Sequence, residues 1–201
     1  MIKILKKNIK QKNIIFLKSS LGNVQFFFID KIFIIPKEIK ISSIKNILFF
    51  ETSLGSLSLK FIDNTYFFIQ NNQLSISLNL NKNKKNILNL YNKLIKIKIK
   101  GVIQGFKMIL FLKGIGFKSF IDENNLILKL GFSHNIVIKI PPNIKIINHS
   151  NSLIFNSIDY ISLSQFVNYI KNHKKPEPFK GKGLVFKNEK ILQKEGKKSK
   201  K

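Results

Sequence analysis

Short runs of hydrophobic residues, separated by turn-prone residues, fill the chain between residues 34 and 80. Each run has the length and the β-branched and aromatic content of a strand. The sequence predicts strands at 44–51, 56–62, 66–70 and 74–80, with one further strand at 26–28. The spacing then changes to that of an amphipathic helix, whose apolar face holds Ile87, Leu90, Tyr91, Leu94 and Ile95. We expect this helix to end near Lys98.

The same order of elements returns after Gly101. A long strand is expected at 107–121, either continuous or broken at Gly114 and Gly116. Shorter strands are expected at 126–130, 136–140, 144–148 and 153–155. A second amphipathic helix follows, with Ser157 or Asp159 as its N-cap. Its apolar face holds Leu163, Phe166, Val167 and Ile170.

Strands followed by one helix therefore occur twice, in segments of similar length. This order predicts the α+β class: two duplicated modules, each an antiparallel sheet packed against one helix, with a basic C-terminal tail. We expect an N-terminal extension at 1–32, a first module at 33–100, a second module at 101–179 and the tail at 180–201.

Net charge indicates the kind of partner. The chain has 201 residues, 36 of them basic and 10 acidic, which gives a formal net charge of +26. Repulsion among these positive charges opposes folding unless counter-charge is supplied. We therefore expect the partner to be a polyanion, with nucleic acid as the first candidate. An anionic membrane surface is the alternative. No uncharged apolar run approaches the ~18 residues of a bilayer-spanning helix, so no membrane span is expected.

Composition points to the kind of genome. The chain lacks arginine, alanine, tryptophan and cysteine, whereas Ile, Lys, Asn, Phe and Leu dominate. The abundant residues have A/T-rich codons, which is typical of a small AT-rich genome such as that of an organelle. We expect a mitochondrial protein made inside the organelle, with a plastid or an AT-rich bacterium as the alternative. Without cysteine the chain has no disulfides, thiolate metal sites or cysteine nucleophiles.

The C-terminal stretch HKKPEPFKGKGL, from His173 to Leu184, carries the densest candidate chemistry. Twelve lysines and three glutamates lie between residues 171 and 201. Proline fixes the path of this backbone, glycine permits close approach and lysine supplies charge, a combination suited to a phosphate surface. The candidate residues here are Lys174, Lys175, Lys180, Gly181, Lys182 and Gly183. The alternative is a solvated charge run, and we expect the tail from Lys180 onward to be disordered without RNA.

Catalytic chemistry is not indicated. His134, His149 and His173 are scattered, no phosphate-binding loop is present, and ten acids leave little material for acid–base pairs. We therefore expect no enzyme activity, cofactor, metal or small-molecule substrate. The phenylalanines Phe106, Phe111, Phe117 and Phe120 could stack on RNA bases, but core packing is the favoured interpretation because they do not share one strand face.

Two segments resemble the ribosomal large-subunit protein six family. Gly101 to Ile144, which contains the GFSH sequence from Gly131 to His134, is similar to the family's second domain, and PEPFKGKGL, from Pro176 to Leu184, is similar to its closing signature. The resemblance implies two duplicated domains that bind large-subunit ribosomal RNA beside neighbouring ribosomal proteins. The second domain would lie near the sarcin–ricin region and the translation-factor site.

Further candidate RNA-binding residues are Lys113, Gly114, Gly116, Lys118, Ser133 and His134. The alternative for the two glycines is a bend that packs two strands together. The chain departs from the family where tyrosine is usual at Phe179, where paired arginines are usual at Lys174 and Lys175, and where proline is usual at Asn135. The predicted function is a structural constituent of the large ribosomal subunit, with a free-standing RNA-binding or chaperone protein as the alternative.

Overall fold

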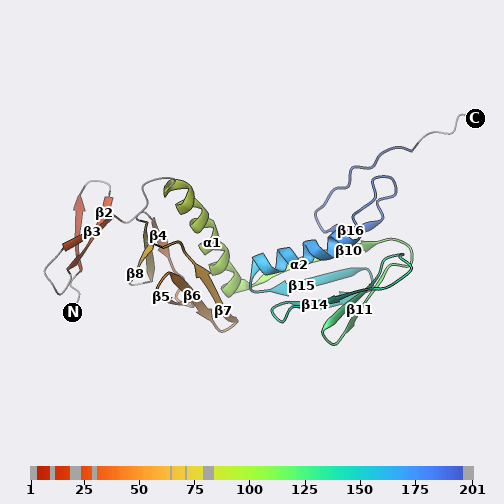
Figure 1. Ribbon diagram of the computed structural model, residues 1–201, viewed down its shortest axis with the longest axis horizontal. Coiled ribbons are helices and arrows are strands. Elements are labelled where there is room, and N and C mark those ends of the chain that lie inside the picture. The colour runs from red at the N-terminus through yellow and green to blue at the C-terminus, as the bar shows by residue number, and fades with distance from the viewer. Residues whose placement is uncertain are drawn as a thin grey trace, which may run out of the picture. The chain divides into compact units, whose positions relative to one another are not determined.

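The computed structural model describes residues 4–9, 12–18, 24–28, 31–63, 65–70, 72–78 and 84–196. The chain divides into two compact units, Met1–Ile103 and Gln104–Lys201, called unit one and unit two below (Figure 1). Each unit contains one helix and several antiparallel strands.

Unit one begins with a small antiparallel sheet of order β1-β2-β3. Its strands are β1 (Ile4–Ile9), β2 (Lys12–Lys18) and β3 (Val24–Phe28). The sequence predicted only one strand in this region, at 26–28, which coincides with part of β3.

Two further sheets and a helix complete unit one. The first sheet has the order β4-β9-β8 and consists of β4 (Lys31–Ile34), β8 (Thr65–Gln70) and β9 (Gln73–Leu78). The second is the meander β5 (Lys40–Ile44), β6 (Ile47–Thr52) and β7 (Gly55–Lys60). Helix α1 (Lys84–Gln104) follows them in the chain.

Helix α1 is longer than the sequence predicted. It runs through Gly101 to Gln104, so the expected end near Lys98 is wrong. Val102 is fully buried, and its carbonyl accepts a 2.8 Å hydrogen bond from the Thr52 hydroxyl on β6. This packing and hydrogen bond outweigh the cost of about 1 kcal/mol of a glycine inside a helix. Near the middle of α1, the centre of the Tyr91 ring lies 4.2 Å from the centre of the Phe61 ring. The Tyr91 hydroxyl accepts a hydrogen bond from the Ile62 backbone N–H.

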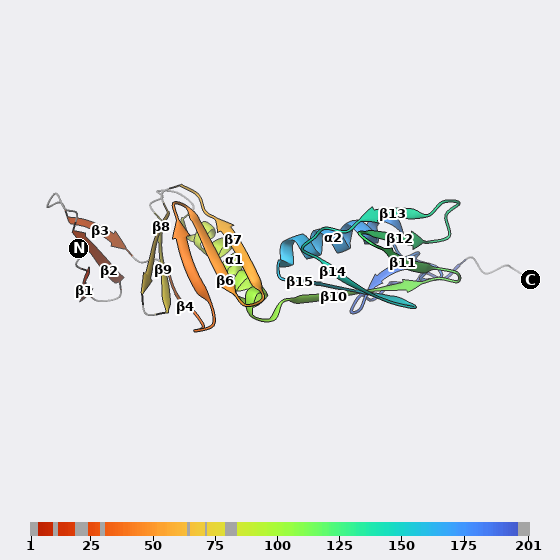
Figure 2. The ribbon, with the colours of Figure 1, turned by 90° about the horizontal axis from the view of Figure 1, so that it is seen from below.

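Unit two repeats this architecture. It contains the sheet β14-β15-β10-β16 and the meander β11-β12-β13. The strands are β10 (Phe106–Lys113), β11 (Lys118–Asp122), β12 (Asn125–Lys129), β13 (Ile136–Lys139), β14 (Lys145–His149), β15 (Ser152–Ser157) and β16 (Gly183–Phe186). Helix α2 (Tyr160–His173) lies on the same side of the larger sheet as the meander (Figure 2).

The strand order confirms the predicted α+β duplication. Both units have a first strand, a three-stranded meander, a hairpin and a helix, and β4 pairs with β9 as β10 pairs with β15. After the β1-β2-β3 sheet, unit one has two sheets, as unit two does, where the sequence predicted one in each module. In unit two the reason is the break between β10 and β11, at the two glycines, which lets the chain leave one sheet and begin another.

One hydrophobic core holds unit two together. The predicted apolar face of α2 is buried as expected, and the Phe166 ring meets the edge of Phe155 from β15. Phe106 and Phe117 pack against this core, which confirms the core interpretation for them. For Phe120 that interpretation is wrong, because its side chain is 53% exposed on β11. At the start of α2, Asp159 is the N-cap.

Strand β16 contradicts the expectation that the chain is disordered from Lys180 onward. It pairs antiparallel with β10, placing Leu184 opposite Leu112 and Val185 opposite Phe111. Leu184 and Val185 are buried. The strand forms because it covers the free edge of β10 and buries apolar side chains in the same step.

Candidate nucleic-acid interface

Three segments of unit two carry every candidate residue selected from the sequence: 113–118, 131–135 and 174–183. We call them the basic loops. Three contacts join them. Lys113 lies opposite Gly183 in the β10–β16 pair, the Phe117 ring lies against Gly131, and Lys174 places its Nζ 4.8 Å from the centre of the Phe132 ring. The fold therefore gathers residues that are up to seventy positions apart in the sequence at one end of unit two.

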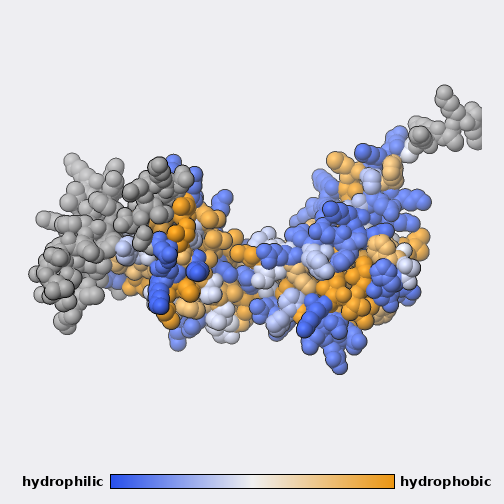
Figure 3. Space-filling view, in the orientation of Figure 1, coloured by the Kyte–Doolittle hydropathy of each residue, from blue (hydrophilic) through white to orange (hydrophobic). Residues whose placement is uncertain are grey.

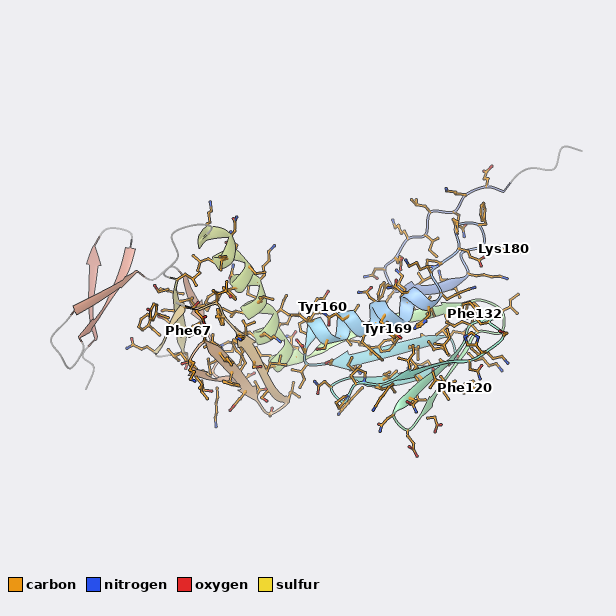
Figure 4. All side chains as sticks on the ribbon, viewed as in Figure 1. Phe67, Phe120, Phe132, Tyr160, Tyr169 and Lys180 are labelled. Carbon is orange, nitrogen blue, oxygen red and sulfur yellow. The ribbon has the colours of Figure 1, made fainter. Side chains whose placement is uncertain are left out.

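Figure 4 labels Lys180 and Phe132, which both lie at the end of unit two where α2 finishes. In Figure 3, hydrophilic side chains gather over α2 and the loops that follow it. The surface at this end is cationic, because the lysines of the basic loops are exposed or half-buried: Lys113, Lys118, Lys174, Lys175, Lys180 and Lys182.

The first basic loop, 113–118, is a tight bend between β10 and β11. The Phe117 N–H donates to the Gly114 carbonyl over 3.4 Å. A Cβ on Gly114 would lie only 2.8 Å from the Phe117 ring, so glycine is needed there for packing. The bend interpretation left open for the two glycines is thus what the structure contains, while Lys113 and Lys118 flank it with exposed side chains.

The third basic loop, 174–183, is held by its own backbone. The Glu177 N–H donates to the Lys182 carbonyl at 2.8 Å, and the Gly181 N–H donates to the Glu177 carbonyl at 3.0 Å. This turn leaves Phe179 and Lys180 at an exposed tip. Because the turn is already formed, the loop would need little further ordering to contact a partner.

Gly183 has a structural role inside the protein. Its φ is +143°, and a Cβ there would lie 2.6 Å from Pro176 Cα and 2.7 Å from the Lys175 carbonyl oxygen. These are backbone atoms that cannot move aside without breaking the turn. Gly181 is buried as well, against Gln193 and Ile191. Both glycines therefore serve the packing of the loop, and their predicted contact with RNA stays a prediction.

The second basic loop holds Ser133 and His134, which are both exposed. The His134 ring lies nearly parallel to Phe132, with an angle of 23° between the planes and 6.2 Å between the ring centres. Phe132 and His173 were not among the site residues selected from the sequence, although both line a cavity beside this loop. The available signals were their positions, since Phe132 lies inside GFSH and His173 directly precedes Lys174.

An ion pair fixes the chain after β16. The Lys171 ammonium on α2 lies 2.6 Å from Glu189 Oε1 and 4.6 Å from the centre of the Phe186 ring. Glu189 Oε2 also accepts from the Phe186 N–H at 3.1 Å. The hydrogen bond from Lys171 lowers the pKa of Glu189, and the Phe186 N–H lowers it further, although burial opposes this shift.

We expect Glu189→Gln to loosen the chain after β16 and to destabilise unit two by about 1 kcal/mol. Because the pKa of Glu189 is lowered in the folded state, its contribution to stability is present above the ordinary glutamate pKa of 4.5 and is lost as pH falls through the lower folded-state pKa. Amide exchange at Phe186 and Lys187 should therefore rise in the variant at pH 7, and in the unaltered chain only in acid. Glu195→Gln, at an exposed carboxylate, is the matched control. Equal exchange in the two variants at pH 7 would contradict the role of this ion pair.

Within the described part of the chain, no helix is both long and apolar enough to cross a bilayer. Among the same residues, no three histidine, aspartate or glutamate side chains come together as metal ligands would.

This arrangement defines a class of protein: a duplicated α+β chain that presents cationic loops from one end of a module. No model of a known protein family matches the chain. Individual relatives do match. The large ribosomal subunit protein uL6c of Thalassiosira pseudonana is 36% identical over 124 residues, which cover 61% of this chain and 66% of the relative.

The match covers a larger share of two relatives that are named large ribosomal subunit protein uL6. The one from Mycoplasmoides gallisepticum is 35% identical over 131 residues, 64% of this chain and 72% of the relative. The one from Karelsulcia muelleri is 40% identical over 139 residues, 66% of this chain and 76% of the relative. The chain belongs to the uL6 family of large ribosomal subunit proteins.

Proposed function

We propose that the chain is a structural constituent of a large ribosomal subunit and binds ribosomal RNA through the basic loops of unit two. The main support for this proposal is that two lysine-bearing loops, 113–118 and 174–183, meet the loop of Ser133 and His134 at one end of that unit. Its membership of the uL6 family supports the same conclusion. The chain acts by neutralising phosphates and bracing RNA helices, and it performs no chemistry on a substrate.

The basic loops fit this role physically. Lys113, Lys118, Lys175 and Lys180 are exposed point charges on segments whose backbone is fixed by turns and strand pairing. Because the backbone is fixed, these charges are held at set spacings. Binding releases counterions from RNA, and the free energy gained is not offset by a large loss of conformational entropy in the protein. Lysine does not form the bidentate phosphate contacts of arginine, so many single contacts replace a few strong ones.

Unit one supplies a second cationic surface. Helix α1 exposes Lys85, Lys93 and Lys96 on the side opposite its buried residues Tyr91 and Ile95. We infer that unit one also contacts ribosomal RNA, as the sequence resemblance implies. The GFSH and PEPFKGKGL segments further support placing unit two near the sarcin–ricin region, beside neighbouring ribosomal proteins.

The location of the ribosome is a separate proposal. The relatives come from chloroplasts and bacteria, which favours a plastid or an AT-rich bacterium. The mitochondrial location expected from composition stays a prediction.

Binding of the full chain to large-subunit ribosomal RNA should depend steeply on salt. Each phosphate contact should contribute ~0.7–0.9 to the slope of log K against log salt concentration. Lys175→Gln should lower that slope by about 1, because Lys175 is exposed on a basic loop. Filter binding across a salt series measures this slope. The control is Lys139→Gln on β13, which removes the same charge outside the basic loops. A slope near zero, or stronger binding to acidic liposomes, would contradict the proposed function.

A further inference from the structure

A cavity of about 400 Å³ opens beside the second basic loop. Its lining comes from the loop, from the start of β13 and from the end of α2: Phe132, His134, Asn135, Ile136, Val137 and His173. The cavity is open to solvent on its outer side, and its lining combines aromatic planes with a few polar groups.

The walls of the cavity suit a flat aromatic group. Phe132 and His134 are nearly parallel, with 23° between their planes. The Phe132 side chain is 40% exposed, so a partner can reach it from solvent. Stacking on aromatic side chains is the usual way in which proteins hold unpaired RNA bases.

One polar atom in the lining lacks a partner. His173 Nε2 is buried and makes no hydrogen bond with any described residue. The His173 ring also packs edge-to-face with the Tyr169 ring, with 4.9 Å between the ring centres. A buried polar nitrogen without a partner is costly. A small rotation of the His173 ring toward the cavity would let the edge of a nucleobase, which offers both donors and acceptors, satisfy it.

The positive charge beside the cavity favours a nucleotide over an apolar side chain as the occupant. Lys174 places its ammonium 4.8 Å from the centre of the Phe132 ring. An apolar side chain from a neighbouring protein would leave this cation without a counter-ion. A nucleotide fills the cavity with its base and brings its own phosphate to the rim.

We propose that this cavity receives one unpaired nucleobase of the ribosomal RNA, stacked on Phe132 and hydrogen-bonded to His173. The proposal rests on the proposed function and adds a base contact to the phosphate contacts already described. The base is held by its face and one edge, and Lys174 neutralises the adjoining phosphate.

The test uses the full chain and a transcript of the large-subunit ribosomal RNA of the organism that carries it. Phe132→Leu should weaken binding about tenfold, because the stacking of one base is removed. His173→Phe should weaken it as well, since the ring remains but the polar nitrogen is gone. The salt slope should stay unchanged in both, which separates a base contact from a phosphate contact. The matched control is Phe120→Leu, because Phe120 is an exposed phenylalanine of the same unit that lies apart from Phe132 (Figure 4).

Chemical probing supplies the second readout. In the complex with the unaltered chain, one unpaired nucleotide should be protected at its base edge from dimethyl sulfate, and Phe132→Leu should restore its reactivity. The proposal is overturned if the two cavity variants bind like Phe120→Leu, or if no unpaired base changes reactivity. It is also overturned if the salt slope falls with Phe132→Leu, because the substitution would then have removed a phosphate interaction. Failure of the unaltered chain to bind the transcript would instead contradict the proposed function.

Discussion

Replacing Gly183 by valine should detach β16 from β10 and disable the basic loops while leaving every charge in place. The new side chain would meet Pro176 Cα and the Lys175 carbonyl at distances below 3 Å, in a backbone conformation that L-residues rarely adopt. Overpacking and backbone strain together should cost about 3 kcal/mol of unit-two stability. Thermal unfolding followed by circular dichroism and incorporation into large subunits are the measurements, and both should be strongly impaired.

Gly196→Val is the matched control, because a Cβ at Gly196 would have nothing within 4 Å. It adds the same bulk to the same basic C-terminal region and should leave stability and assembly unchanged. Lys194→Gln removes one exposed charge and should cost about 1 kcal/mol of RNA binding or less. If Gly183→Val assembles normally while Lys194→Gln does not, charge alone governs this region and our account of the loop is wrong.

Replacing Phe155 by alanine should unfold unit two and spare unit one. Phe155 is fully buried on β15, where it packs against Phe166, and such truncations cost about 3–5 kcal/mol. Because the two units are separately compact, limited proteolysis should degrade 104–196 and leave a protected fragment of unit one. RNA binding through the basic loops should be abolished.

The matched variant is Phe50→Ala, since Phe50 is equally buried in unit one. It should give the converse result, with a protected fragment of unit two that still binds RNA with a salt-dependent affinity. A single cooperative transition, in which either substitution exposes both units to protease, would contradict two independently folding units.

Elements with a strong periodic pattern were predictable from the sequence. The apolar face of α2 and the strands β7 and β12 follow from local spacing, because their own side chains decide which face is buried. The duplication was predictable for the same reason, since the order of these signals repeats. The break at Gly114 and Gly116 was also anticipated as one of two alternatives.

Elements that depend on distant partners were not predictable. Strand β5 has only one half-buried residue, Ile41, and exists because β6 pairs with it. Strand β16 follows a segment rich in proline, glycine and lysine, and its partner β10 lies some seventy residues earlier in the chain. The end of α1 was missed because the burial of Val102, and not the local helix propensity of Gly101, decides where the helix stops.

The residues of the candidate site also divide into those that the sequence could predict and those that it could not. Lysines such as Lys113 and Lys180 could be selected because a charge and its neighbouring glycines are visible in the sequence. The cavity between Phe132 and His173 could not, since about forty residues separate them and only the packing of α2 beside the second basic loop brings them together.

Sedimentation through a sucrose gradient at high salt tests directly whether the chain is a constituent of the large ribosomal subunit. The sample is a cell or organelle lysate, and the chain is detected by an antibody. Since Gly183→Val keeps all charges, it serves as the paired variant. We expect the unaltered chain to stay with the large ribosomal subunit after the salt wash and the Gly183→Val variant to be lost from it. Recovery of the unaltered chain at the top of the gradient, or in RNA particles without the large subunit, would contradict this expectation and favour a free-standing RNA-binding protein.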